Sequence, residues 1–104
     1  MSLDNATIRN FRRIGHHLSP IVMISSGLSE NIMAEIDRAL SDHELIKIKV
    51  NTSDREAKKA LIKEICLEKN AELVQQIGHV ALLFRAAKKP DPRLSNLLRY
   101  KSDS

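Results

Sequence analysis

The segment Leu45–Val50 alternates apolar and basic side chains, and this alternation constrains the fold more than any other feature of the chain. A β-strand has a side-chain period of two, so Ile46 and Ile48 fall on one face while Lys47 and Lys49 fall on the other. Two ammonium groups roughly 7 Å apart on one rigid strand attract anions. The pattern therefore predicts a sheet with one packed apolar face and a cationic row on the other.

Helical and extended periodicities alternate along the rest of the chain, and they predict an α/β domain with the order α-β-α-β-α-β-β. Ser29 has the N-cap position of the second helix, Ser53–Glu56 has the capping-box spacing of the third, and Asn70 is suited to end that helix. The remaining expected elements are a helix over Ala6–His16 and strands over Pro20–Ile24, Leu45–Val50, Glu72–Ile77 and Val80–Arg85.

The connections between these elements predict a four-stranded mixed sheet with helices packed on it. Helical crossovers make parallel neighbours of the first three strands, and the tight Gly78-His79 connection adds one antiparallel strand. Pro20–Ile24 is an unbroken apolar run, so we expect an interior strand covered on both faces. Residues 1–86 would form the single compact domain, and the basic, proline-interrupted residues 87–104 a mobile tail.

Composition excludes several classes of protein. No apolar run approaches the roughly 18 residues that a membrane span needs. Cys66 is the single cysteine, which excludes an internal disulfide and a cysteine-based zinc site. With no apolar signal segment near the N-terminus, we expect a cytoplasmic protein. Aromatic residues make up 3% of the chain, so phosphates rather than stacked bases would supply most of the affinity for a nucleic acid.

The excess of positive charge is modest but segregated. The formal net charge is +4 and the isoelectric point is near 9.5. Four basic side chains of the first expected helix lie within an arc of roughly 100°, opposite its apolar side, namely Arg9, Arg12, Arg13 and His16. The cluster is either a plain solvated helix face or an extension of the cationic row on the Leu45–Val50 strand.

Several segments also follow a known pattern in order and spacing. They are Gly15–Ile24, Ala34–Leu40, His43–Lys49, Asp54–Glu56, Val74–Gly78 and Leu82–Arg85. Together they resemble the YhbY family, the bacterial form of the CRM RNA-binding domain. The resemblance implies a sheet with helices packed on it, similar to the C-terminal domain of bacterial translation initiation factor three. It also implies an RNA-binding protein linked to the maturing large ribosomal subunit.

The chain departs from this family in the loop after the first strand. The family carries a Gly-x-x-Gly loop there, whereas this chain reads Ile24-Ser25-Ser26-Gly27. Either Ile24 replaces the first glycine or the loop is one residue shorter. Glycine lets a phosphate approach backbone N–H groups at a helix N-terminus, and the two serines can still donate hydrogen bonds there.

The leading hypothesis is a noncatalytic protein that binds structured ribosomal RNA. It needs no cofactor or metal, and it has no small-molecule substrate and no membrane partner. The sequence leaves its oligomeric state open, with a monomer favoured. The residues expected to contact RNA are Ser25, Ser26, Gly27, Lys47, Lys49, Arg9, Arg12, Arg13, His17 and Arg55.

Two other functions remain open at this point. Because the glycine loop is incomplete and aromatic residues are scarce, the chain is alternatively a protein-interaction factor of ribosome assembly with weak or no direct RNA binding. A small acid–base enzyme would use His16 or His17 with Glu44, but their spacing does not suggest convergence in a cleft.

Overall fold

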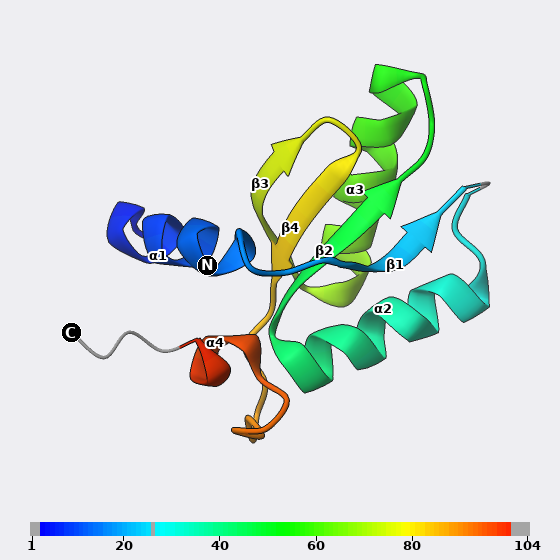
Figure 1. Cartoon of the computed structure of the whole chain (residues 1–104). Helices are drawn as coiled ribbons and strands as arrows, with labels where there is room; N and C mark the ends of the chain where they lie inside the picture. Colours follow the sequence, from blue (N-terminus) through cyan, green and yellow to red (C-terminus); the bar gives the residue numbers. More distant parts are fainter. Residues whose placement is uncertain (1–2, 26, 101–104) are drawn as a thin grey trace.

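The computed structural model describes residues 3–25 and 27–100, which form a four-stranded mixed sheet with helices packed on both faces (Figure 1). The expected order of seven elements is confirmed, and a short eighth element follows them. The elements are α1 (Asn5–Gly15), β1 (Pro20–Ile24), α2 (Glu30–His43), β2 (Leu45–Val50), α3 (Arg55–Lys69), β3 (Glu72–Ile77), β4 (Val80–Phe84) and α4 (Asn96–Arg99). In the described part of the chain, no helix is long and apolar enough to span a membrane.

The strands lie in the order β1-β2-β4-β3. β1 and β2 are parallel, as expected for a helical crossover, and β4 is antiparallel to both β2 and β3. The expectation that β2 and β3 are neighbours is therefore wrong. The reason is that β4 returns from the turn at Gly78, where φ is +58°, and inserts between them, which fully buries Ala81 and Leu83 in the middle of the sheet.

β1 is an edge strand, so the prediction of an interior strand covered on both faces is also wrong. Val22 and Ile24 are buried, but Ile21 is 46% exposed and Met23 is 57% exposed. An edge position suits the proline that begins this strand, because proline has no N–H to donate to a neighbour. The apolar run predicted burial on both faces, yet more than half of the Met23 side chain on the second face of β1 is exposed.

The two faces of the sheet are covered unequally. α2 and α3 pack on the face that carries the alternate apolar residues of β2, and together they form the larger core. α1 packs on the other face, over a smaller cluster made of Phe11, Ile14, Leu45, Val74 and Leu82. The larger part of the folding free energy therefore comes from the first face, because hydrophobic stabilisation scales with buried apolar area.

Helix termini follow the sequence signals closely. The Ser29 hydroxyl accepts a hydrogen bond from the Ile32 N–H at 3.1 Å, which confirms it as the N-cap of α2. Asp54 rather than Ser53 caps α3, with its carboxylate accepting from the Glu56 N–H at 3.0 Å. Asn70 ends α3 in the left-handed conformation, with φ of +52°, as expected.

Within the segment expected to be a mobile tail, residues 87–100 contact the domain through hydrogen bonds to Glu44 and Leu45. Ser95 is fully buried and donates a hydrogen bond to Glu44 Oε1 at 2.7 Å. The Asn96 side chain donates to the Leu45 carbonyl at 2.7 Å, and the Ala87 N–H donates to Glu44 Oε2 at 2.8 Å. These hydrogen-bonding groups are polar, so hydrophobic periodicity in the sequence does not predict their burial. Residues 101–104 of the expected tail lie outside the described residues.

Candidate nucleic-acid interface

Lys47 and Lys49 lie on the sheet face that α1 covers only in part. Their neighbours Ile46, Ile48 and Val50 are buried in the core on the opposite face, which confirms the alternation expected from the sequence. On this partly open face Lys47 is paired in register with Leu82 of β4, and Lys49 with Val80. Both lysines are half-buried, which is usual for a side chain whose apolar stem packs while its ammonium group stays in water.

A groove runs between the last turns of α1 and this face of the sheet. Its volume is about 230 Å³, and we call it the basic groove. Three cationic or titratable side chains line it, namely Arg12, His16 and Lys47, and none of the described residues along it is acidic. The helix arginine and the strand lysine, which are 35 positions apart in sequence, therefore face one cavity. The floor consists of the sheet residues Gln75, Ile77, Val80 and Leu82, and Gly15 of α1 completes the lining.

Close packing of α1 on the sheet brings these groups together. Gly15 is buried, and a Cβ at this position would lie 2.8 Å from Cδ2 of Leu82. Phe11 packs its ring 4.8 Å from that of Phe84, with 41° between the planes. These contacts fix the rotation of α1, so Arg12 and His16 point along the open part of the sheet.

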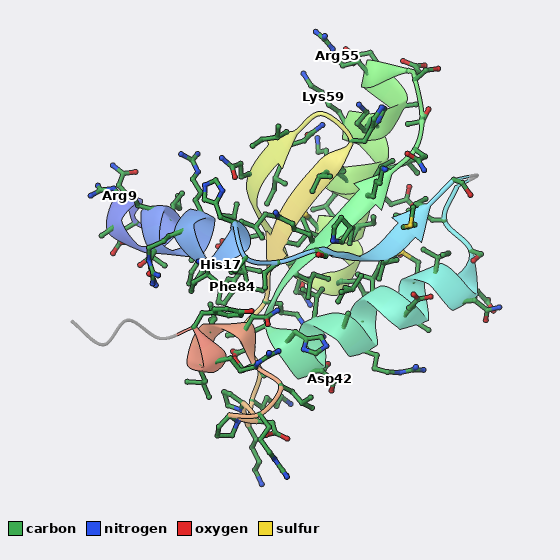
Figure 2. All side chains as sticks on the ribbon, viewed as in Figure 1. Arg9, His17, Asp42, Arg55, Lys59 and Phe84 are labelled. Atoms are coloured by element: carbon green, nitrogen blue, oxygen red, sulfur yellow. The ribbon has the colours of Figure 1, made fainter. Side chains whose placement is uncertain are left out.

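The other helix arginines lie farther from the sheet. Arg9 is one turn before Arg12 on the same side of α1, toward the end of the helix that points away from the sheet (Figure 2). Arg13 is exposed and donates a hydrogen bond to Asn10 at 2.8 Å. Neither residue lines the basic groove.

The loop between β1 and α2 follows the part of β1 that pairs with β2 at Lys49. Lys49 is paired with Met23 of β1, and Met23 also lines a small cavity of about 210 Å³ with Ser25 and Gly27. Gly27 has φ of +109°, and among the described residues other than its chain neighbours no atom lies within 4 Å of the position a Cβ would take, so a ligand can approach its backbone. Ser26, the middle residue of the expected loop site, lies outside the described residues.

Arg55 and His17 occupy separate positions. Arg55 is the exposed first residue of α3 and stands beside Lys59, well separated from Arg9 (Figure 2). His17 follows α1, and its ring stacks on that of Tyr100 at a centroid distance of 5.5 Å. The structure thus brings Arg12 and Lys47 together and leaves Arg13 and Arg55 apart from them.

The other histidines and the cysteine show no catalytic arrangement. His43 Nδ1 lies 2.7 Å from the Leu94 carbonyl, so this ring joins the end of α2 to the segment after β4. His79 Nδ1 lies 3.1 Å from the Val50 carbonyl, so this ring joins the β3–β4 turn to β2. Burial raises the pKa of the Cys66 thiol, with a smaller contribution from the nearby Glu72 carboxylate. A raised pKa disfavours the reactive thiolate. Within the described ranges, no group of three His, Cys, Asp or Glu residues could hold a metal ion.

The sequence did not predict the sheet residues that form the floor of the groove. Gln75 and Ile77 are two positions apart on β3, so the strand period places both side chains on the same face of the sheet. This much could have been predicted from the sequence. Their position beside Lys47, however, depends on the insertion of β4 between β2 and β3, which the sequence pattern did not predict.

Comparison with known proteins gives a consistent match. The model of the CRS1 / YhbY (CRM) domain matches residues 3–85. A Pseudomonas aeruginosa protein named "Probable RNA-binding protein" is 43% identical over 101 residues, covering 96% of this chain and 97% of that protein. A Haemophilus influenzae protein named "RNA-binding protein" is 47% identical over 77 residues, covering 73% of this chain and 78% of its own. The solution structure of a hypothetical protein from Staphylococcus aureus has a TM-score of 0.73 at 32% identity, covering 85% of this chain and 93% of that one.

Proposed function

Because the chain belongs to the CRS1 / YhbY (CRM) domain family, we propose that it binds structured RNA, through the sheet face that carries the basic groove. The observation that carries the proposal is the convergence of Arg12, His16 and Lys47 on one cavity without an acidic neighbour among its described lining residues. Guanidinium and ammonium groups bind phosphate oxygens strongly, and a groove of one sign concentrates the field.

The contact surface extends from the basic groove toward the β1–α2 loop. Lys49 continues the cationic row, and the open backbone at Gly27 offers N–H groups near the N-terminus of α2. The further proposed contacts are Arg9, Arg13, His17, Ser25, Ser26 and Arg55. Most of these groups recognise phosphate rather than base edges, so affinity would depend on RNA shape and on salt.

The proposed RNA is ribosomal RNA of the assembling large subunit, and the proposed place of action is the cytoplasm. Support comes from relatives that are named RNA-binding proteins and from the resemblance to the YhbY family, which implies that link. The role is noncatalytic, since the described titratable residues of the basic groove lack a carboxylate partner for acid–base work.

The test is binding of the purified protein to protein-free large-subunit ribosomal RNA across a series of salt concentrations. We expect an affinity that falls steeply with salt, by about 0.7–0.9 in log–log slope for each phosphate contact. The exposed apolar residues Met23 and Ile77, on the same sheet face as Lys47 and Lys49, favour the alternative of a protein partner. Association with ribosomal particles that survives RNase treatment, together with no binding to the free RNA, would support that alternative.

A further inference from the structure

A second cavity lies beside the basic groove and shares Lys47 with it. Its volume is about 220 Å³, and we call it the tail cavity because α4 forms one wall. The ionisable side chains along it are His17, His43, Lys47, Arg99 and Tyr100, and none of the described lining residues is acidic. The cavity is therefore suited to an anion, by the same reasoning as the basic groove.

α4 is held in place by buried hydrogen bonds, so the wall it forms has a fixed position. Ser95 caps the helix and is itself fully buried against Glu44, and Asn96 is bonded to the first residue of β2. Leu97 packs against the smaller core beneath α1. Arg99 thus lies at a defined place near Lys47 rather than on a free chain end.

The rings at the cavity wall add rigidity and a second kind of contact. The His17 and Tyr100 rings are nearly parallel, with 7° between their planes and 5.5 Å between their centroids. The Arg99 guanidinium carbon lies 5.6 Å from the centre of the Tyr100 ring. A guanidinium on an aromatic face keeps its N–H edge free to donate, so it can hold a phosphate in a fixed geometry.

We propose that the tail cavity binds a phosphodiester group of the RNA, so that the docked segment after β4 extends the RNA-binding surface beyond the CRM domain. The family match ends at residue 85, whereas Arg99 and Tyr100 lie 14 and 15 residues beyond it. Lys47 would then contact phosphates on both of its sides, from the basic groove and from the tail cavity. This inference rests on the proposed function.

Two arginines of the same segment provide a matched test. Arg99→Ala removes a cavity charge, and Arg93→Ala removes the same charge from a side chain that is 92% exposed and lies outside the cavity. With protein-free large-subunit ribosomal RNA as the probe, we expect Arg99→Ala to weaken binding about tenfold. Its salt slope should fall by about 0.7–0.9, while Arg93→Ala stays within about twofold of the unchanged chain. Arg99→Lys should keep the slope, because it keeps the charge.

The outcomes separate the two proposals. If the unchanged chain binds the RNA but Arg99→Ala equals Arg93→Ala, the tail cavity has no phosphate and only this inference falls. If Arg99→Lys is as weak as Arg99→Ala and also loses the slope, the effect is not a charge contact, which likewise overturns it. If the unchanged chain does not bind the RNA, the proposed function falls and this inference with it.

Discussion

Replacing Lys47 and Lys49 together with alanine is expected to weaken binding to protein-free large-subunit ribosomal RNA about 100-fold. Hydrogen bonds to charged groups contribute about 1.5–3 kcal/mol each, so each lost phosphate contact costs about tenfold or more. Lys47 lines both the basic groove and the tail cavity, and Lys49 lies between that groove and the β1–α2 loop. Counting one neutralised phosphate charge per lysine, the log–log salt slope should fall by about 1.4–1.8 in total, measured by filter binding over a salt series.

The matched control is the double replacement of Lys59 and Lys63 with alanine. These exposed lysines sit on α3, which covers the opposite face of the sheet, and their loss changes the net charge equally. We expect only a small, salt-screened loss of affinity from them. A slope for the Lys47 and Lys49 double variant that equals that of the unchanged chain would mean that both lysines only solvate the sheet.

Replacing Arg85 with methionine is expected to lower the free energy of unfolding by about 3 kcal/mol. The Arg85 guanidinium donates to Asp37 Oδ1 at 2.8 Å, to the Asp37 carbonyl at 2.9 Å and to the Ser41 hydroxyl at 2.8 Å. It also donates to the Lys69 carbonyl at 3.1 Å, at the end of α3. One side chain at the end of β4 thus ties α2 to α3. Methionine keeps part of the apolar stem and removes every donor.

Urea denaturation measures this loss, with Arg93→Met as the control, expected within about 0.5 kcal/mol of the unchanged chain. The pH dependence adds a second readout. The hydrogen bond from Arg85 lowers the pKa of Asp37 below 3.8, so this contribution is present above that pH and is lost as pH falls through the lowered value. The Arg85→Met variant should lose less stability over that acid window. Equal stability of Arg85→Met and the unchanged chain at neutral pH would contradict this account.

The sequence predicted the local structure well, because local structure depends on nearby residues. The period of two in β2 correctly placed Lys47 on the face opposite the buried Ile46 and Ile48. As expected, the Ser29 side chain caps the start of α2, and Asn70 ends α3 in the left-handed conformation. The order of elements and the mixed sheet were correct for the same reason. The expected order of strands within the sheet was wrong, because β2 pairs with β4 through contacts between residues far apart in sequence.

The assembly of the candidate site was predictable only in part. Arg12 and Lys47 do face one groove, but this depends on the close approach of Gly15 to Leu82. The spacing of residues in the sequence does not predict this tertiary contact. The docking of α4 depends on two buried polar residues, Ser95 and Asn96, and on the packing of Leu97 against the smaller core, in a segment whose composition is typical of a tail. Polar anchors leave no hydrophobic period, so sequence patterns could not distinguish a docked segment from a free one.

The most direct test of the shared basic surface is a double-mutant cycle between Arg12 and Lys47, measured as affinity for large-subunit ribosomal RNA at one salt concentration. If the two side chains act on the same stretch of RNA backbone, the loss from Arg12→Ala should be smaller in the Lys47→Ala background. The expected coupling is about 0.5–1 kcal/mol. Strictly additive losses of affinity would contradict a single surface built from α1 and β2. So would unchanged affinity of both single variants for an RNA that the unchanged chain binds.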